Sequence, residues 1–366
     1  MNLRRSGCFR EALTILCFFV ASAGDSARGD VFHMNSGLHS LELVPVGNPG
    51  NPGDTQFMND WTTGYGAVAY PYLMGKYEIT AAQYTQFLNS VAKTDTYGLY
   101  DPYMMVFANG CRIVRAGRSS AYSYSVALDF ANRPVNYINY WDAARFANWL
   151  HNGQPSGLQD AVTTEDGAYT LNGYTGSDGT SIARNPGARF FIPSESEWYK
   201  AAYYDPVAGH YWDYPTGTDA VPDQAITNPD TGNNANYDYA LGAGSPFYYR
   251  NVVGEFENSE SPYGTYDQLG NVWEWNEAIL VDEPTLDRRG LRGGAFESGL
   301  FFAVISSRTL YMDSPDENQY NVGFRIAAAV PEPSTVVLSA IALVGVARRS
   351  KRRRMTANRV NLSPMD

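Results

Sequence analysis

The stretch Tyr263-Gly-Thr-Tyr-Asp-Gln-Leu-Gly-Asn-Val-Trp-Glu-Trp275 combines two carboxylates, a turn-forming glycine and two tryptophans. Asp267 and Glu274 supply hard anionic oxygens, and Gly270 permits a turn that directs main-chain carbonyls inward. Calcium prefers such a mixture of carboxylate and carbonyl oxygens. A purely structural alternative is that Asp267 caps a turn and that Glu274 pairs with an arginine such as Arg292.

Outside this stretch, three amphipathic or capped helices are predicted. Two of them begin with a capping box, in which the first and fourth residues satisfy each other's amides. The third shows apolar residues at the helical spacing. The signals are Thr80-Ala-Ala-Gln83 with Tyr84, Phe87, Leu88 and Val91; Ala143, Phe146, Ala147 and Leu150 within 141–151; and Ser194-Glu195-Ser196-Glu197 before Asp205-Pro206.

Most of the remaining chain is predicted to be loop. Segments 152–188 and 205–246 are rich in Gly, Asn, Asp and Pro, and long irregular loops of this kind tend to carry function. Short strands are predicted at Phe247–Val253, Leu300–Ile305 and Val322–Ala327. No linker divides the chain, so we expect one α+β domain with few helices and short antiparallel strands.

Six segments occur in an order that resembles the sulfatase-modifying-factor family, the formylglycine-generating enzyme domain. The resemblance covers roughly residues 40–328, and it implies a single loop-rich domain with a variant C-type-lectin-like fold. The segments are Met74–Thr80, Arg133-Pro-Val135 with Trp141-Asp-Ala143, Ala188–Trp198, Tyr263–Trp275, Leu291-Arg-Gly-Gly-Ala-Phe296 and Asn321-Val-Gly-Phe-Arg325.

The oxidase chemistry of that family does not follow from the resemblance. Active members hold copper through two cysteine thiolates shortly after the Gly-Gly pair, but residues 292–308 contain no cysteine here. A soft copper site needs soft ligands, which Ser298, Ser306 and Ser307 cannot replace. Copper is therefore not expected, and no catalytic residue is assigned.

Iron-dependent relatives in the superfamily use histidine ligands, but the histidines of this chain do not indicate an iron site. The four histidines, His33, His39, His151 and His210, are scattered along the chain. His151 falls at a predicted helix end, where a histidine is more often a partner of the helix dipole than a metal ligand.

The resemblance does imply a structural calcium. Its ligands would be the side chains of Asp267 and Glu274 and the main-chain carbonyls of Gly270 and Val272. A second family calcium would use Asn236 and the main-chain carbonyl of Tyr237.

Three other features have a structural and a functional interpretation. Trp273 and Trp275 are expected to pack in the core. The aromatic loop 203–214 could stack on sugars if exposed, but a self-packed loop is favoured. Gly293 and Gly294 are expected to permit close backbone approach, and Arg292 and Arg325 are expected to hold buried carboxylates.

The charge distribution excludes a nucleic-acid binder. The chain has 27 Lys and Arg against 38 Asp and Glu, a net charge of −11. The two ends are basic, and residues 28–347 alone carry 17 positive and 35 negative side chains, a net charge of −18. Such a body has no basic face to neutralise phosphates.

Both ends of the chain carry targeting signals. Arg4 and Arg5, an apolar run and Ala21-Ser-Ala23 predict a signal peptide over residues 1–27. The end of the chain has Pro331-Glu-Pro333, a short apolar stretch and an arginine-rich cluster. This order resembles the PEP-CTERM sorting signal over residues 329–354, with a tail at 355–366, and implies recognition and cleavage by an exosortase after export.

These observations favour an exported domain (residues 28–328) that is transiently anchored in the inner membrane and then reaches the cell envelope or the extracellular space. We expect it to act as a calcium-stabilised binding or scaffolding module for an extracellular polysaccharide or an envelope protein. Two alternatives stay open: an enzyme with redirected, non-copper chemistry that uses Glu297 and Ser298, and a purely structural matrix component.

Overall fold

The chain divides into two compact units, Met1–Ala329 and Val330–Asp366, and the architecture below is that of the first unit. The computed structural model describes residues 30–32, 40–106, 109–225, 229–238, 249–283, 286–303, 305, 307–308 and 314–330. The predicted signal peptide, the sorting signal beyond Val330 and the C-terminal tail lie outside the described residues. No helix within these ranges is both long enough and apolar enough to cross a membrane.

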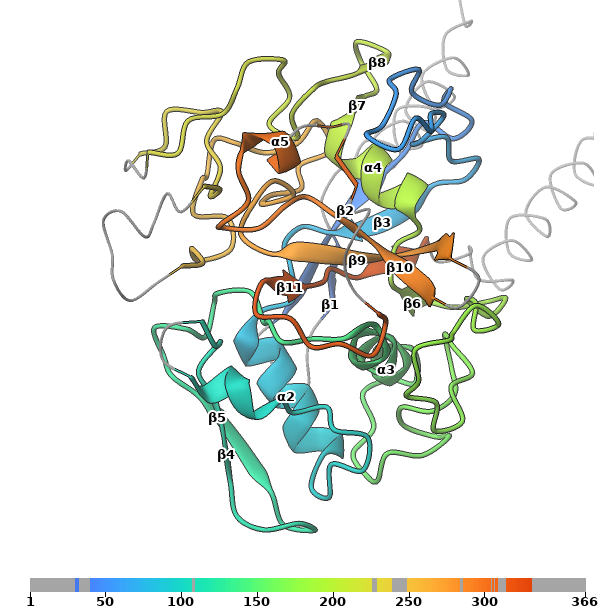
Figure 1. Ribbon diagram of the computed structural model, residues 1–366, viewed down its shortest axis with the longest axis vertical. Helices are drawn as coiled ribbons and strands as arrows, with labels where there is room; N and C mark the ends of the chain where they lie inside the picture. Colours follow the sequence, from blue (N-terminus) through green and yellow to red (C-terminus); the bar gives the residue numbers. More distant parts are fainter. Residues whose placement is uncertain are drawn as a thin grey trace, which may run out of the picture. The chain divides into compact units, whose positions relative to one another are not determined.

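Short strands and a few helices alternate with long loops along the chain (Figure 1). The elements are β1 (Asp30–Phe32), β2 (Leu41–Val46), β3 (Tyr72–Gly75), α2 (Ala81–Val91), η2 (Pro102–Met105), β4 (Ile113–Ala116), β5 (Ser123–Val126), α3 (Tyr140–His151), β6 (Phe190–Phe191), α4 (Glu195–Tyr203), β7 (Tyr204–Asp205), β8 (His210–Tyr211), β9 (Trp273–Glu283), β10 (Leu286–Arg292), α5 (Leu300–Ala303), β11 (Val322–Gly323) and β12 (Ala327–Ala329). This composition confirms the predicted α+β domain with few helices and short antiparallel strands.

The largest sheet joins the two ends of the domain. Its strand order is β1-β2-β3-β12-β6, and every neighbouring pair is antiparallel. Strand β12 lies between β3 and β6, with Ala327 opposite both Met74 and Phe191. The last strand is therefore an interior strand of the sheet, so β6 joins the sheet only when the C-terminal part of the domain is in place.

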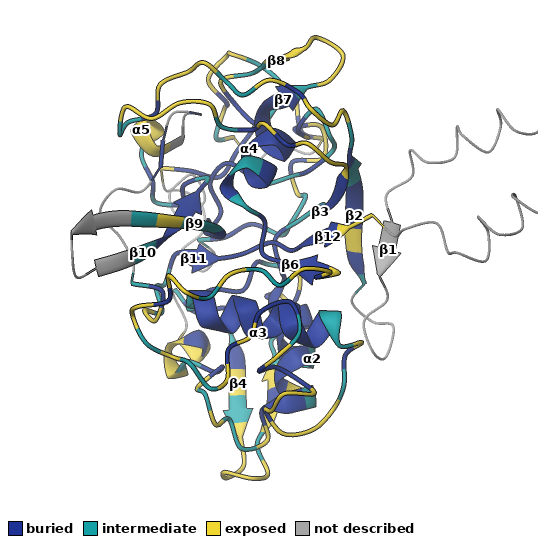
Figure 2. Cartoon of the chain, turned by 90° about the vertical axis from the view of Figure 1, so that its right-hand side faces the viewer, coloured by how far each residue is buried: buried dark blue, intermediate teal, exposed yellow. Residues whose placement is uncertain are grey.

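Helices α2 and α3 pack together beside this sheet and are almost entirely buried on their inner faces (Figure 2). Phe87 of α2 meets Phe146 of α3 edge to face at 5.2 Å, and Phe146 meets Phe324 at 5.4 Å. The capping boxes predicted at Thr80 and Ser194 are both present. The helix predictions are thus confirmed, because periodicity and capping are local signals.

A second sheet has the strand order β10-β9-β11. Strands β9 and β10 form a long hairpin, whereas β11 runs parallel to β9 and places Gly323 opposite Glu274. The sequence analysis did not predict this hairpin. The parallel register of β11 on β9 aligns Glu274 with the segment that contains Arg325.

Two strand predictions are wrong and a third is partly right. Residues 300–303 form the short helix α5, and residues 249–253 contain no strand. The predicted strand at Val322–Ala327 is divided between β11 and β12, which belong to different sheets. Short apolar runs do not distinguish a strand from a buried helix or a packed loop.

Candidate functional site

The loop that precedes β9 adopts left-handed backbone conformations at three positions. Asp267 and Asn271 each have φ of 59°, and Gly270 has φ of 81°. A Cβ atom on Gly270 would lie 1.9 Å from the carbonyl oxygen of Asn236, and the Asn271 N–H donates to that same oxygen at 2.8 Å. Glycine is needed here both for its φ and because the neighbouring chain approaches so closely.

Glu274 is fully buried and accepts hydrogen bonds at both carboxylate oxygens. Its Oε2 accepts from Arg325 Nε at 2.5 Å and from Trp198 Nε1 at 2.7 Å, and its Oε1 accepts from Arg325 Nη2 at 2.6 Å. Arg325 is the partner of Glu274, whereas the sequence analysis offered Arg292 as the example. The expectation that Arg325 holds a buried carboxylate is confirmed.

Asp267 lies at the start of the same loop, where its Oδ2 accepts from the Gly254 N–H at 2.6 Å. Burial raises the pKa of this carboxyl to about 6, against the lowering effects of the Gly254 hydrogen bond and of the Arg325 charge. Asp267 does act as a turn-stabilising acceptor, as the structural alternative supposed.

Glu78, which the sequence analysis did not single out, belongs to the same cluster. It is 1% exposed, and neither of its carboxylate oxygens has a hydrogen-bond partner. Burial raises its pKa well above the usual value, and the charges of Asp267 and Glu274 add to this effect. The sequence signal that could have identified Glu78 is its position between Tyr77 and Ile79, just before the Thr80 helix cap.

The cluster therefore contains three carboxyl groups and one guanidinium. When Glu78, Asp267 and Glu274 are all ionised, Arg325 offsets only one of the three charges. Buried carboxylates without a partner either take up protons or need another cation. Across the described residues, no three His, Cys, Asp or Glu side chains form a metal-binding group by themselves, so a cation here would also need main-chain carbonyls such as those of Gly270 and Val272.

A second buried ionic network lies next to the Gly-Gly pair. Glu195 accepts from Arg292 Nε at 2.9 Å and from Arg308 Nη2 at 2.6 Å, and Arg308 also pairs with Asp60. Gly293 and Gly294 both have positive φ, at 98° and 75°. Two predictions are thus confirmed: Arg292 holds a buried carboxylate, and Gly293 and Gly294 permit close approach of neighbouring backbone.

The serines that follow Gly-Gly have structural contacts. Ser298 is buried, and its Oγ accepts from the Ala295 N–H at 2.8 Å, which closes a turn. The Ser307 carbonyl accepts from Arg292 at 3.0 Å, and Ser306 lies outside the described residues. Glu297 accepts from Asn321 at 2.5 Å through Oε1, while its Oε2 has no partner.

The histidines that the structure describes do not converge. His151 ends α3, and its Nδ1 accepts from the Arg189 N–H at 3.0 Å. Burial and the Arg189 charge lower the pKa of His151. His210 is on β8, 4.2 Å from the Trp212 ring, and His33 and His39 lie outside the described residues.

The aromatic loop at 203–214 has packed tyrosines at its two ends, whereas residues 206–210 are exposed. Tyr203, Tyr204 and Tyr214 are buried, and the Tyr204 and Tyr211 rings lie 4.9 Å apart. Trp273 and Trp275 are 7% and 0% exposed. These rings support the fold, as the structural interpretation predicted.

Two family models match the chain. Residues 58–330 match the sulfatase-modifying factor enzyme 1-like domain, and residues 329–354 match the PEP-CTERM protein-sorting motif.

Among curated relatives, the chain is similar to two proteins named hercynine oxygenase. The Mycolicibacterium smegmatis protein is 36% identical over 98 residues, which are 27% of this chain and 19% of the relative. The Mycobacterium tuberculosis protein is 24% identical over 212 residues, which are 54% of this chain and 37% of the relative. The chain thus spans well under half the length of these relatives.

Among solved structures, Treponema denticola variable protein 1 is similar with a TM-score of 0.50 and 18% identity, over 82% of this chain and 99% of that chain. At this level of identity the likeness concerns the fold alone.

Proposed function

The chain belongs to the family of sulfatase-modifying factor enzyme 1-like domains. We propose that this member is an exported, calcium-stabilised binding module for an extracellular polysaccharide or envelope protein. The observation that carries this proposal is the absence of cysteine from residues 292–308. Without thiolates, the family's copper has no soft ligands in this segment.

The structural roles of the neighbouring residues support the same conclusion. Ser298 closes a turn, and Arg292 is held by Glu195. A serine nucleophile needs a base within hydrogen-bond reach, but the contact of the Ser298 hydroxyl is with a main-chain amide. The contacts of Ser298 and Arg292 therefore support a structural role for this segment.

Calcium would be held by Asp267, Glu274 and the carbonyls of Gly270 and Val272, and Glu78 would add its negative charge beside this set. Glu78 supports the assignment because its two oxygens have no partner and it lies near both other carboxylates. A divalent cation would balance the two negative charges that Arg325 leaves uncompensated. When bound, calcium supplies charge compensation and rigidity to the loop before β9.

The PEP-CTERM motif implies export to the cell envelope and processing by an exosortase at the C-terminus. A binding module displayed there would meet glycans and envelope proteins as its natural partners.

Metal analysis of the purified protein, combined with a binding assay, tests the proposal. We expect about one bound calcium, no stoichiometric copper or iron, and saturable binding to the producing cell's extracellular polysaccharide or to an envelope protein. Stoichiometric copper, or formylglycine formation in a sulfatase-derived peptide, would overturn it.

A second candidate is an enzyme with different chemistry. It is favoured by the similarity to hercynine oxygenases and by Glu297, whose burial raises its pKa and whose Oε2 has no partner. Oxygen consumption that depends on iron and is lost in Glu297→Gln would support this candidate against the binding module.

A further inference from the structure

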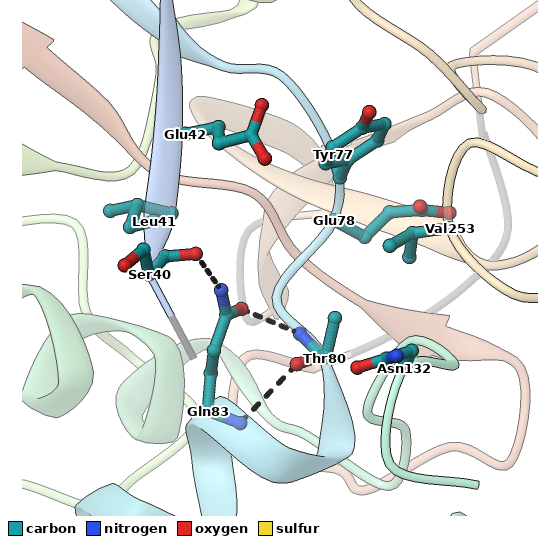
Figure 3. Close-up of a pocket in the computed structure, with 9 residues that line it drawn as sticks. All are labelled: Ser40, Leu41, Glu42, Tyr77, Glu78, Thr80, Gln83, Asn132 and Val253. Atoms are coloured by element: carbon teal, nitrogen blue, oxygen red, sulfur yellow. Dashed lines mark hydrogen bonds between the residues drawn. The ribbon is translucent and has the colours of Figure 1, made fainter. Parts of the chain in front are cut away.

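A surface pocket of about 210 Å³ lies between the start of β2 and the N-terminus of α2 (Figure 3). Its walls come from four separate parts of the chain. Glu42 is on β2, Tyr77 and Glu78 precede α2, and Asn132 and Val253 come from two loops. This pocket is distinct from the segment that follows Gly293–Gly294.

The wall formed by α2 is held in place by hydrogen bonds. Gln83 Oε1 accepts a hydrogen bond from the Thr80 main-chain N–H at 2.9 Å. The main-chain N–H of Gln83 in turn donates to Thr80 Oγ1 at 3.3 Å. Its side-chain amide donates to the Ser40 carbonyl at 3.0 Å. The capping box thus links α2 to β2, and the pocket shape does not depend on a ligand.

Other groups around the pocket retain capacity for hydrogen bonds. The Glu42 side chain is 46% exposed, and only its Oε2 pairs with Lys76, at 3.3 Å. Asn132 accepts from the Val253 N–H through its main-chain carbonyl, and its exposed side chain lines the pocket. A carboxylate that accepts and a carboxamide that both donates and accepts are suited to the hydroxyl groups of a sugar.

The pocket also has apolar surface and a definite charge. The Tyr77 ring and Val253 form part of the wall, which suits the C–H faces of a sugar ring. The Glu42 carboxylate faces the pocket, whereas its counter-ion Lys76 is not a lining residue and is engaged by Glu42 and by the Tyr77 ring at 5.1 Å. Anionic ligands are therefore disfavoured.

The volume indicates the size of the ligand. A volume of about 210 Å³ lies just below the range of pockets that hold drug-sized ligands, and it suits a ligand of the size of one sugar ring. A bare cation would leave most of this space filled with water.

We propose that this pocket binds one neutral, hydroxyl-rich sugar unit of an extracellular glycan. Sugar hydroxyls donate to Glu42 and exchange hydrogen bonds with Asn132, and the sugar ring lies against Tyr77 and Val253. The inference rests on the proposed binding function and assigns it a site.

The test measures binding of methyl hexosides by titration calorimetry and saturation-transfer NMR with the full chain. The neutral probes are the methyl glycosides of glucose, galactose and mannose, and the charged probes are glucosamine and glucuronate. The pocket variants are Glu42→Gln and Asn132→Ala. The controls are Lys76→Gln, which breaks the Glu42 ion pair but keeps the carboxylate, and Glu317→Gln, an exposed carboxylate outside the pocket.

We expect at least one neutral hexoside to bind, and both pocket variants to bind it at least tenfold more weakly. The two controls should stay within about twofold of the wild type, and glucuronate should not bind, because charged hydrogen bonds dominate recognition in such a pocket.

Three results would overturn the proposal. Unchanged binding in both pocket variants would remove the site but leave the binding function intact. Binding of glucosamine without any neutral hexoside would show an amine site. No hexoside binding by the wild type would also reject the pocket, while the polysaccharide and envelope-protein assays described above decide separately whether the module binds at all.

Discussion

Arg325 donates two hydrogen bonds to the carboxylate of Glu274, and both side chains are shielded from solvent. The same guanidinium donates to the carbonyls of Gly75 and Tyr266, each at 2.9 Å. Arg325, which lies between β11 and β12, therefore connects the end of β3 to the loop before β9 and to β9 itself. The two ends of the domain meet at this contact.

Arg325→Met should destabilise the domain by about 3–5 kcal/mol, because Glu274 would remain buried without its cation. Chemical denaturation measures this loss. The matched control is Lys76→Met, which breaks a solvent-exposed pair with Glu42 and should cost no more than about 1 kcal/mol. Equal losses in the two variants would contradict the role given to Arg325.

Gly270→Ala should lower the free energy of unfolding by more than about 2 kcal/mol, because it adds a steric clash to backbone strain. Gly187→Ala separates the two effects. Gly187 has the same φ of 81°, but a Cβ there would meet nothing within 4 Å. Thermal unfolding should therefore show a clearly larger loss for Gly270→Ala, and similar losses would reject the clash with Asn236.

Glu78→Gln should stabilise the calcium-free protein at pH 7 by about 1–3 kcal/mol, because a neutral amide replaces a buried carboxyl whose ionised form has no compensating partner. The pKa of Glu78 is raised, so its favourable contribution is present below the unfolded pKa and is lost as pH rises through the folded pKa. The advantage of the variant should thus grow with pH in chelator. Added calcium should stabilise the wild type more than the variant, and an equal response would exclude a contribution of Glu78 to the cation site.

Glu197 should contribute to stability against acid. Burial raises its pKa, but the hydrogen bonds and charge of Arg184 outweigh this and leave the pKa lowered. Its contribution is present above the unfolded pKa and is lost as pH falls through the folded pKa. Glu197→Gln should therefore be about 2 kcal/mol less stable than wild type at pH 7. Urea unfolding at pH 3 should show a smaller gap, and a constant gap would contradict the assignment.

Expression in a host that has an exosortase should shorten the chain near Pro331–Pro333. Intact-mass measurement of the released protein would give the new C-terminus. Replacing Pro331-Glu-Pro333 by alanines should leave the full-length form in the membrane fraction, and release of the variant at the wild-type level would contradict the role of the motif.

The helices illustrate what local sequence signals can predict. The capping boxes at Thr80 and Ser194 and the apolar spacing of α2 involve residues within one or two helical turns of each other. Their interactions are the same in any tertiary context, so the sequence analysis located them correctly. Residues 300–303 lack such signals, and there an apolar run was mistaken for a strand.

Only part of the candidate cation site could be predicted from the sequence. Asp267 and Glu274 stood out because they share one short motif with Gly270. Glu78 did not, since its importance depends on burial beside carboxylates from a distant segment. The partner of Glu274 likewise depends on the parallel register of β9 and β11.

The sequence by itself determined the family, the helices, the loss of the thiolate pair and the sorting motif, because each is a property of residue identity and short-range order. Tertiary structure alone decided which arginine neutralises Glu274, that Glu78 has no partner, and that Glu42 and Asn132 share a pocket. These facts depend on contacts between segments far apart in the chain, and burial sets the free energy of each charge only after those contacts have formed.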